Sequence, residues 1–277
     1  MIDPIRTWNG AIVPLGDSRR PTASIGDAGH ARGPRRGVGH ARPYRTREAD
    51  RRLRPMAPYK TPEYHPAFEE YCEAIFELRE DDVDVIQARI AERLDVSRPA
   101  VSEMIHRMQD QGLVTADGAI RLTADGLDLA ERVVRRHRLA ERFLTDILEL
   151  SWAEAHAEAG RWEHVISDRV EAALVRVLGA PTTCPHGNPI PGSDYRAPDA
   201  VPLEGLAVGD HFEVARIPEE LEFAPGLLEF LEESHLVPGS RGEVTSASPD
   251  GTRTVEVDGQ RVGIGTFAST RILVTTA

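Results

Sequence analysis

Apolar side chains recur at helical spacing through three successive stretches that begin near residue 64. These stretches read AFEEYCEAIFELRE, DVIQARIAERLDV and SRPAVSEMIHRMQDQGLV. Ser97 is placed to cap the third helix, Pro99 stands in its first turn, and Gly112 is placed to end it. The next segment, LVTADGAIRLT, has the pattern of two short strands around an Asp117–Gly118 turn. The order of these elements predicts a winged helix-turn-helix over residues 59–123.

A winged helix-turn-helix presents the helix after its tight turn to the major groove of DNA. The segment LDVSRPAVS has the form of that turn, so the expected partner is a double-stranded DNA operator. The alternative is a winged helix that contacts only other proteins.

Three more stretches with helical spacing follow, and they predict a helical domain over residues 124–180. Ser151 and Glu154 form a candidate capping box for the second of these helices. Ser167 is placed to cap the third, and Gly179 to stop it. The apolar stripes are wider than a small winged helix can cover, so we expect a homodimer, which also doubles the DNA contacts.

The last part of the chain changes pattern. Residues 181–200 are rich in Pro and Gly and have no periodicity, which is typical of a linker. Residues 201–277 contain short strand-like runs and one short helix, APGLLEFLEESH, which predicts an SH3-like β-barrel of the FeoA type. The expected fold class is therefore mainly α with a small β domain.

Charge is distributed unevenly along the chain. The net charge is −12, but residues 1–55 carry twelve arginines against five acids, while the rest of the chain is strongly acidic. Residues 1–58 lack apolar periodicity and are expected to be disordered. A basic arm of this kind can hold DNA non-specifically. The favoured interpretation is an over-extended gene start, with Met56 as the true one, because the chain holds a single lysine, Lys60, and such Arg-heavy usage suggests GC-rich coding.

The composition also bears on location. The sequence contains no apolar run long enough to span a membrane and no compact apolar region of a secretory signal. Two cysteines, Cys72 and Cys184, give no disulfide framework. We therefore expect a cytoplasmic protein.

Histidines and glutamates share helix faces in the middle of the chain. His137 and Glu141 are four residues apart, and the next helix carries a second set on one face, at His156, Gly160, Glu163 and His164. The first helix adds Glu69, Glu70 and Glu73. Imidazole with carboxylate suits Mn, Fe, Co, Ni or Zn. The simpler interpretation is the solvated face of a helix.

Four motifs occur in order: ARIAERLDVSRPAVSEMIHRMQDQGLV, HRLAERFLTDIL, RWEHVISDRVE and HGNPIPG. With them the chain resembles the DtxR family of iron- and manganese-dependent repressors, from about residue 64 to residue 277 and most densely over residues 86–192. The resemblance implies a cytoplasmic homodimer with three domains per subunit. It also implies that Mn(II) or Fe(II) favours the DNA-competent state. In that state the two DNA-binding domains of the dimer have the spacing that a palindromic operator requires.

The resemblance implies an ancillary metal site formed by His137, Glu141 and His156. The family draws two further ligands from the C-terminal domain, but those positions hold Ala224 and Leu227, which cannot bind metal. Candidate substitutes are Glu219, Glu220 and Glu222.

The resemblance also implies a regulatory site that includes Glu163 and His164. The iron branch adds a methionine and a cysteine at the positions of Glu70 and Gly160, whereas the manganese branch has acids at Glu70, Glu73 and position 160. The chain thus matches the manganese branch in the first helix and neither branch at position 160. Loss of the sulfur donors favours Mn(II). Three consequences of Gly160 stay open: water completes the site, Glu70 and Glu73 compensate, or the site is weakened.

Two further sets of residues follow from the resemblance. An anion-binding pocket is implied at Arg138 and Asn188, with Cys184 at a position that is usually serine.

The residues nearest the DNA groove are Ser97, Arg98, Pro99, Ala100, Ser102 and Glu103, and the candidate phosphate contacts are Arg93, Arg98, Arg107 and Arg121. Glu103 stands where the iron branch has glutamine, and since glutamate can accept from cytosine N4, we expect a different operator.

The sequence therefore predicts a metal-dependent transcriptional repressor of metal-homeostasis genes. One alternative is a winged-helix regulator that has lost metal control. A second is a metallohydrolase, but the chain lacks H-E-x-x-H, a nucleophile motif and a Gly-rich phosphate loop, so no enzyme is expected.

Overall fold

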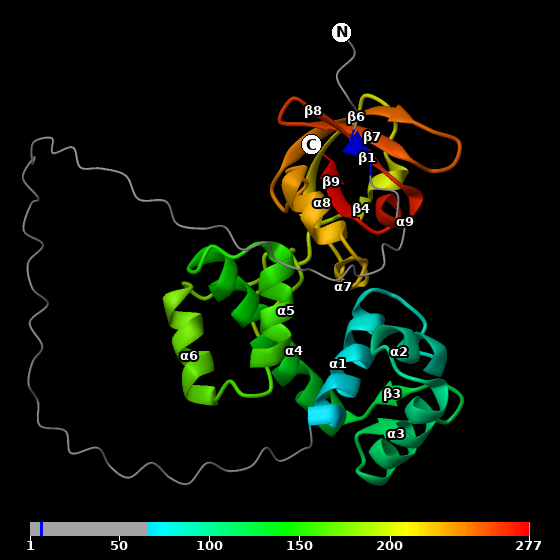
Figure 1. Ribbon diagram of the computed structural model, residues 1–277, viewed down its shortest axis with the longest axis vertical. Coiled ribbons are helices and arrows are strands. Elements are labelled where there is room, and N and C mark those ends of the chain that lie inside the picture. Colours follow the sequence, from blue (N-terminus) through cyan, green and yellow to red (C-terminus); the bar gives the residue numbers. More distant parts are fainter. Residues whose placement is uncertain (1–5, 8–65, 277) are drawn as a thin grey trace, which may run out of the picture. The chain divides into compact units, whose positions relative to one another are not determined.

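The computed structural model describes residues 6–7 and 66–276 (Figure 1). The first domain contains α1 (Pro66–Glu80), α2 (Gln87–Arg93) and α3 (Arg98–Asp110), followed by the wing strands β2 (Val114–Thr115) and β3 (Arg121–Leu122). The Ser97 hydroxyl accepts a hydrogen bond from the Ala100 amide, and Gly112 ends α3 with a φ of +73°. The predicted winged helix-turn-helix is thus present, and its expected first residues, 59–65, lie outside the described range.

The helical domain follows the predicted order, with α4 (Ala124–Asp146), α5 (Trp152–Trp162) and α6 (Asp168–Val177). The Ser151–Glu154 capping box opens α5, and the Ser167 side chain caps α6. Helix α4 packs against α1, α5 and α6 (Figure 1). Since α4 touches both the DNA-binding domain and its own helical partners, it is the scaffold from which the site below is built.

The segment 181–200 is more than the linker that the sequence predicts. Cys184, His186 and Asn188 are buried, and Thr183 bridges Pro189. The His186 ring lies against the Trp152 ring, with centroids 4.5 Å apart and an interplanar angle of 87°. Residues 193–199 are without helix or strand and are mostly exposed, so only this later part resembles a linker.

The C-terminal domain is built around one sheet, with strand order β1-β8-β7-β6-β5-β9-β4, in which β1 is Arg6–Thr7. Its strands are β4 (Val201–Pro202), β5 (His211–Arg216), β6 (Arg241–Ala247), β7 (Arg253–Val257), β8 (Gln260–Ile264) and β9 (Leu273–Thr276). The helical elements are η1 (Leu203–Gly205), α7 (Glu219–Glu222), α8 (Leu227–Glu233) and α9 (Thr266–Ser269). Phe212, Val244, Val255 and Leu231 belong to its apolar core. The predicted strands and α8 are present, whereas α7 and α9 were not predicted.

One part of the N-terminal prediction is corrected. Strand β1 (Arg6–Thr7) pairs in parallel with Val262 and Gly263 of β8, so these two residues are not disordered. The rest of the Arg-rich segment lies outside the described residues, and so does the question of its start. Within residues 6–7 and 66–276, none of the helices is both long enough and apolar enough to cross a membrane.

Candidate metal centre

Four separate elements bring His, Cys and Glu side chains together in one buried group, which we call cluster 1. It comprises Glu141 on α4, His156 on α5, Cys184 and His186 in the following segment, and Glu222 at the end of α7. Glu141 Oε1 lies 3.0 Å from His156 Nδ1, and Glu222 Oε2 lies 2.9 Å from His186 Nδ1. Glu141, Cys184 and His186 each offer a donor atom, and these atoms all lie within 4.8 Å of one another. The three residues predicted for the ancillary site, His137, Glu141 and His156, meet the same criterion, so the structure brings that triad together.

Several donor atoms of cluster 1 are buried without a hydrogen-bond partner. They are Glu141 Oε2, Glu222 Oε2 and both ring nitrogens of His186. Leaving buried polar atoms unpaired costs about 1–3 kcal/mol each, so native structures rarely tolerate several in one place. His186 Nδ1 and His156 Nδ1 lie 2.9 and 3.1 Å from Glu222 Oε2, so nitrogen and oxygen donors converge on one place without a hydrogen bond that satisfies this oxygen. The donor set therefore fits a divalent cation.

A second group, cluster 2, lies beside the first and comprises Glu69, Glu73, His137, Glu163 and His164. His137 Nδ1 is 2.6 Å from Glu163 Oε2, and its Nε2 is 3.2 Å from Glu141 Oε1 of cluster 1. His164 Nδ1 is 2.7 Å from Glu69 Oε2, and its Nε2 is 3.1 Å from Glu163 Oε1. Glu73, His137 and Glu163 meet the same 4.8 Å criterion, and Glu73 Oε1 is buried without a partner. Cluster 2 has only nitrogen and oxygen donors.

The structure refines the predicted role of Glu70. Its side chain is 52 % exposed, and its Oε1 is 3.8 Å from His164 Nε2, so Glu69 makes the shorter contact with that histidine. Both Glu70 and Gly160 line a cavity of about 230 Å³ that also reaches His137 and Glu163. A Cβ atom built on Gly160 meets nothing within 4 Å. The position of the missing ligand is therefore open space.

Carboxylates set the charge of the histidines. Burial opposes protonation, but Glu141 and Glu222 together raise the pKa of His156 to about 10. His137 follows the same rule, since Glu141 and Glu163 outweigh its burial and raise its pKa well above the ordinary value. Burial raises the pKa of the Cys184 thiol well above its ordinary value, with Glu141 adding to the effect. These groups therefore hold protons that cation binding must displace.

Arg138 and Asn188 come together as the resemblance implies, but the structure corrects the expectation of an anion pocket. The fully buried Arg138 guanidinium donates to Glu80 and Glu219, with Nη2–Oε distances of 2.7 and 3.0 Å. The Asn188 amide donates to Glu222 Oε1 at 2.7 Å. The chain's own carboxylates thus occupy the donors that were expected to bind an external anion.

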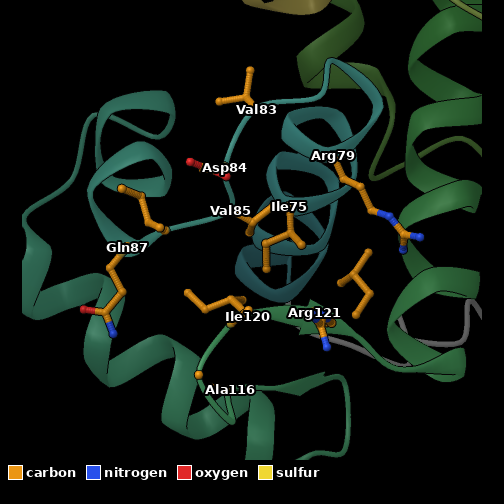
Figure 2. A pocket seen from close by; sticks show the side chains of 13 residues that line it. Ile75, Arg79, Val83, Asp84, Val85, Gln87, Ala116, Ile120 and Arg121 are labelled. Atoms are coloured by element: carbon orange, nitrogen blue, oxygen red, sulfur yellow. The ribbon is translucent and has the colours of Figure 1, made fainter.

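The residues predicted to contact DNA fall into exposed and buried ones. Those predicted nearest the groove lie at the start of α3. Ser102 is partly covered, and the others are exposed: Ser97, Arg98, Pro99, Ala100 and Glu103. Arg107 and Arg121 are also exposed, and Arg121 lines a hollow of about 600 Å³ with Ile75 and Ile120 (Figure 2). The phosphate contact predicted at Arg93 is wrong, because that side chain is only 5 % exposed and pairs with Glu77.

Five exposed apolar side chains lie on the helical domain. They lie after the end of α4, in the loop before α6 and on α6 itself, at Ile147, Leu148, Val165, Val170 and Val177, each about half exposed or more. Isolated exposed apolar residues are ordinary, but Val170 and Val177 lie seven residues apart on one face of α6, which makes that face a candidate contact surface for another protein.

Sequence reasoning missed His186 and placed Cys184 only in the anion pocket. Both stand in the run CPHGN, where a Cys and a His, two metal-ligating residue types, occur two positions apart. Of the three acids offered as substitutes, Glu222 joins cluster 1 and Glu219 lies within reach of His156, whereas Glu220 pairs with Arg271. Leu227 is fully buried in the apolar core of the C-terminal domain.

Comparison with known protein families gives three matches along the chain. Residues 64–119 match the iron dependent repressor N-terminal DNA binding domain, and residues 123–192 match the iron dependent repressor metal binding and dimerisation domain. Residues 201–276 match the FeoA domain. These are the domains of a DNA-binding regulator and not of an enzyme.

Individual proteins agree with these matches. The iron-dependent repressor IdeR of Mycobacterium tuberculosis is 43 % identical over 204 residues, which covers 69 % of this chain and 88 % of that protein. The diphtheria toxin repressor of Corynebacterium diphtheriae is 51 % identical over 128 residues, 46 % of this chain and 57 % of that protein. A solved manganese-dependent transcriptional repressor in complex with manganese is 34 % identical, with a TM-score of 0.69, and covers 76 % of this chain and 100 % of its own.

Proposed function

This chain belongs to the DtxR family of iron- and manganese-dependent repressors, and we propose that clusters 1 and 2 are the sites through which Mn(II) or Fe(II) controls it. It is a metal-dependent, DNA-binding transcriptional repressor of metal-homeostasis genes. It acts in the cytoplasm as a homodimer on a palindromic operator.

One observation carries this proposal: buried, unpaired donor atoms converge in cluster 1. Glu141, Cys184, His186 and Glu222 would hold one cation there, with His156 beside them. Glu73, His137, Glu163 and His164 would hold a second in cluster 2. Bound in these places, a divalent cation supplies positive charge to carboxylates that otherwise repel one another. The preference for Mn(II) was inferred because the methionine and cysteine donors of the iron branch are missing. Since Cys184 gives cluster 1 a soft donor, that preference applies to cluster 2 alone.

The chain's connectivity links these sites to the DNA-binding domain. Glu69 and Glu73 lie on α1, which packs against α2 within the apolar core of that domain. His137 and Glu163 lie on α4 and at the end of α5, in the helical domain. Cluster 2 therefore joins two domains, so its occupancy favours the arrangement in which α1 and α4 are held together. That is a population shift towards the DNA-competent state.

The exposed apolar group on the helical domain supplies the dimer surface. Val170 and Val177 are 48 % and 58 % exposed and lie seven residues apart on α6, on one face of that helix. A second copy that covers this face would bring two α3 helices to one DNA duplex, as a palindromic operator requires.

The test begins with DNA selection. A random duplex library is incubated with the Mn(II)-loaded full chain, and the enriched duplex is used to measure affinity without metal and with Mn(II), Fe(II), Co(II) or Zn(II). We expect affinity to rise at least tenfold with the physiological metal, and expect Glu141→Gln to lose that gain. Affinity that ignores every metal would instead support the regulator that has lost metal control.

A further inference from the structure

Arg93 lies at the junction between the two helices of the DNA-reading motif. It is the last residue of α2, and the tight turn that follows leads to Ser97, the cap of α3. The turn is held by backbone hydrogen bonds from Leu94 to Ile90 and from Val96 to Ala91. A displacement of the Arg93 side chain therefore acts only five residues before the first residue of the recognition helix, Arg98.

The Arg93 side chain points away from DNA into the protein. Its Nη1 donates to Glu77 Oε2 at 2.8 Å, and the two side chains are 5 % and 6 % exposed. Its guanidinium carbon lies 4.2 Å from the centroid of the Phe223 ring, within the range of a cation–π contact. The hydrogen bond from Nη1 and the contact of the guanidinium face with the ring together restrict the orientation of this side chain, while Nη2 is buried without a hydrogen-bond partner.

Phe223 connects this arginine to cluster 1. The residue follows α7, the short helix that carries Glu219 and Glu222. Its ring meets the His156 ring edge to face, with centroids 5.4 Å apart and an angle of 89°. Phe223 therefore touches a histidine of the metal centre on one side and the end of α2 on the other.

Glu77 supplies a second connection, through α1. It is four residues after Glu73 of cluster 2, so both carboxylates lie on the same face of that helix. Arg93, Phe223, Glu77 and Glu73 all line the 230 Å³ cavity beside Gly160. Two chains of residues, one through Phe223 and one through Glu77, thus run from the metal clusters to one side chain at the turn of the reading motif.

We propose that Arg93 is a positioning residue that couples metal occupancy to the placement of the recognition helix α3, through Glu77 on one side and Phe223 on the other. The inference rests on the proposed function, and it assigns to the C-terminal domain a part in the switch through Phe223. The effect on DNA affinity is a coupling between two sites, which is measured as the ratio of affinities with and without metal.

The test uses the full chain, and its variants are chosen so that neither Glu77 nor Arg93 is left as a buried charge without its partner. Glu77→Gln combined with Arg93→Gln removes the ion pair as a unit, and Phe223→Leu removes the ring. Phe223→Tyr keeps the ring and serves as the conservative control. Phe267→Leu is the matched control, because Arg271 lies 4.3 Å from the Phe267 ring centroid in the same kind of contact without touching a metal cluster.

Three quantities are measured: Mn(II) affinity without DNA, affinity for the selected duplex with and without Mn(II), and Mn(II)-induced amide hydrogen-exchange protection of residues 94–102. For the double variant and Phe223→Leu we expect Mn(II) affinity within twofold of wild type. We also expect the Mn(II)-dependent gain in DNA affinity to fall at least fivefold, with loss of the induced protection. The two controls should match wild type.

Other results overturn the inference. It is wrong if the variants keep the wild-type gain, if they lose DNA affinity equally with and without Mn(II), or if they lose Mn(II) binding itself. A wild-type protein whose DNA affinity ignores metal would overturn the proposed function and this inference with it, so the two failures are distinguishable.

Discussion

Gly160 offers the most direct test of the metal centre, because a ligand can be added there without displacing anything. A Cβ at this position meets open space, and the neighbouring cavity of about 230 Å³ has room for a carboxylate. The residue lies in the last turn of α5, where glycine is not required by a left-handed backbone. Gly160→Glu should therefore fold with its side chain directed towards Glu163 and His137.

The substitution changes two quantities, the stability of the metal-free protein and its affinity for Mn(II). Replacing glycine in a helix by glutamate gains about 0.5 kcal/mol of stability. Without metal, however, the new charge stands three residues from Glu163, and at a separation of ~6 Å and an effective dielectric constant of ~20 the repulsion is about 3 kcal/mol. The metal-free variant should thus be about 2 kcal/mol less stable than wild type. A cation shared by both carboxylates removes that repulsion, so Mn(II) affinity should rise at least tenfold, about 1.4 kcal/mol.

Calorimetric titration measures the affinity for Mn(II), and urea unfolding without metal measures the stability of the metal-free protein. Gly160→Ala is the control for helix propensity and should be about 1 kcal/mol more stable than wild type with unchanged Mn(II) affinity. Gly160→Gln controls for size without charge. If Gly160→Glu binds Mn(II) within twofold of wild type, the cavity does not face the cation and the assignment of cluster 2 is wrong.

Four further outcomes are expected. Saturation with Mn(II) at 100 times its dissociation constant should stabilise the protein by about 2.7 kcal/mol, seen as a higher melting temperature that a chelator reverses. Arg98→Ala should weaken binding to all duplexes and lower the slope of log affinity against log salt by about 1, whereas Arg93→Gln should leave that slope unchanged. Val170→Glu should convert the dimer to a monomer in sedimentation experiments. Arg138→Met should cost about 3–5 kcal/mol in urea unfolding, because Glu80 and Glu219 lose the cation that pairs with them.

The helices could be predicted from sequence because their signals are local. Apolar spacing and caps such as Ser97 and Ser151 act within one or two turns, and the structure confirms both caps. His137, Glu141 and Glu163 could be found for the same reason, since each lies on a helix face that the spacing defines. Their approach to one another across α4 and α5 then follows from the packing of these helices.

What could not be predicted depends on contacts between distant segments. His186 stands in a Pro- and Gly-rich stretch whose composition is typical of an exposed loop, and it is buried by distant residues that include Trp152 and Glu222. Helix α7 is four residues long with the sequence EELE, which has no apolar period. Arg93 has the local pattern of a surface residue, and only the distant Phe223 and the buried Glu77 reveal its position.

The two clusters are joined by His137, and this has a consequence for how they fill. One ring nitrogen of His137 lies 2.6 Å from Glu163 of cluster 2, while the other lies 3.2 Å from Glu141 of cluster 1. If a cation in cluster 2 took one nitrogen of this imidazole, the remaining nitrogen would face Glu141 and could orient that carboxylate by a hydrogen bond. Filling of the proposed cluster 2 site would then order a ligand of the proposed cluster 1 site, and by reciprocity the converse would hold. We therefore expect Mn(II) titration of the wild-type chain to show positive cooperativity, and two independent, non-cooperative binding steps would contradict this reasoning.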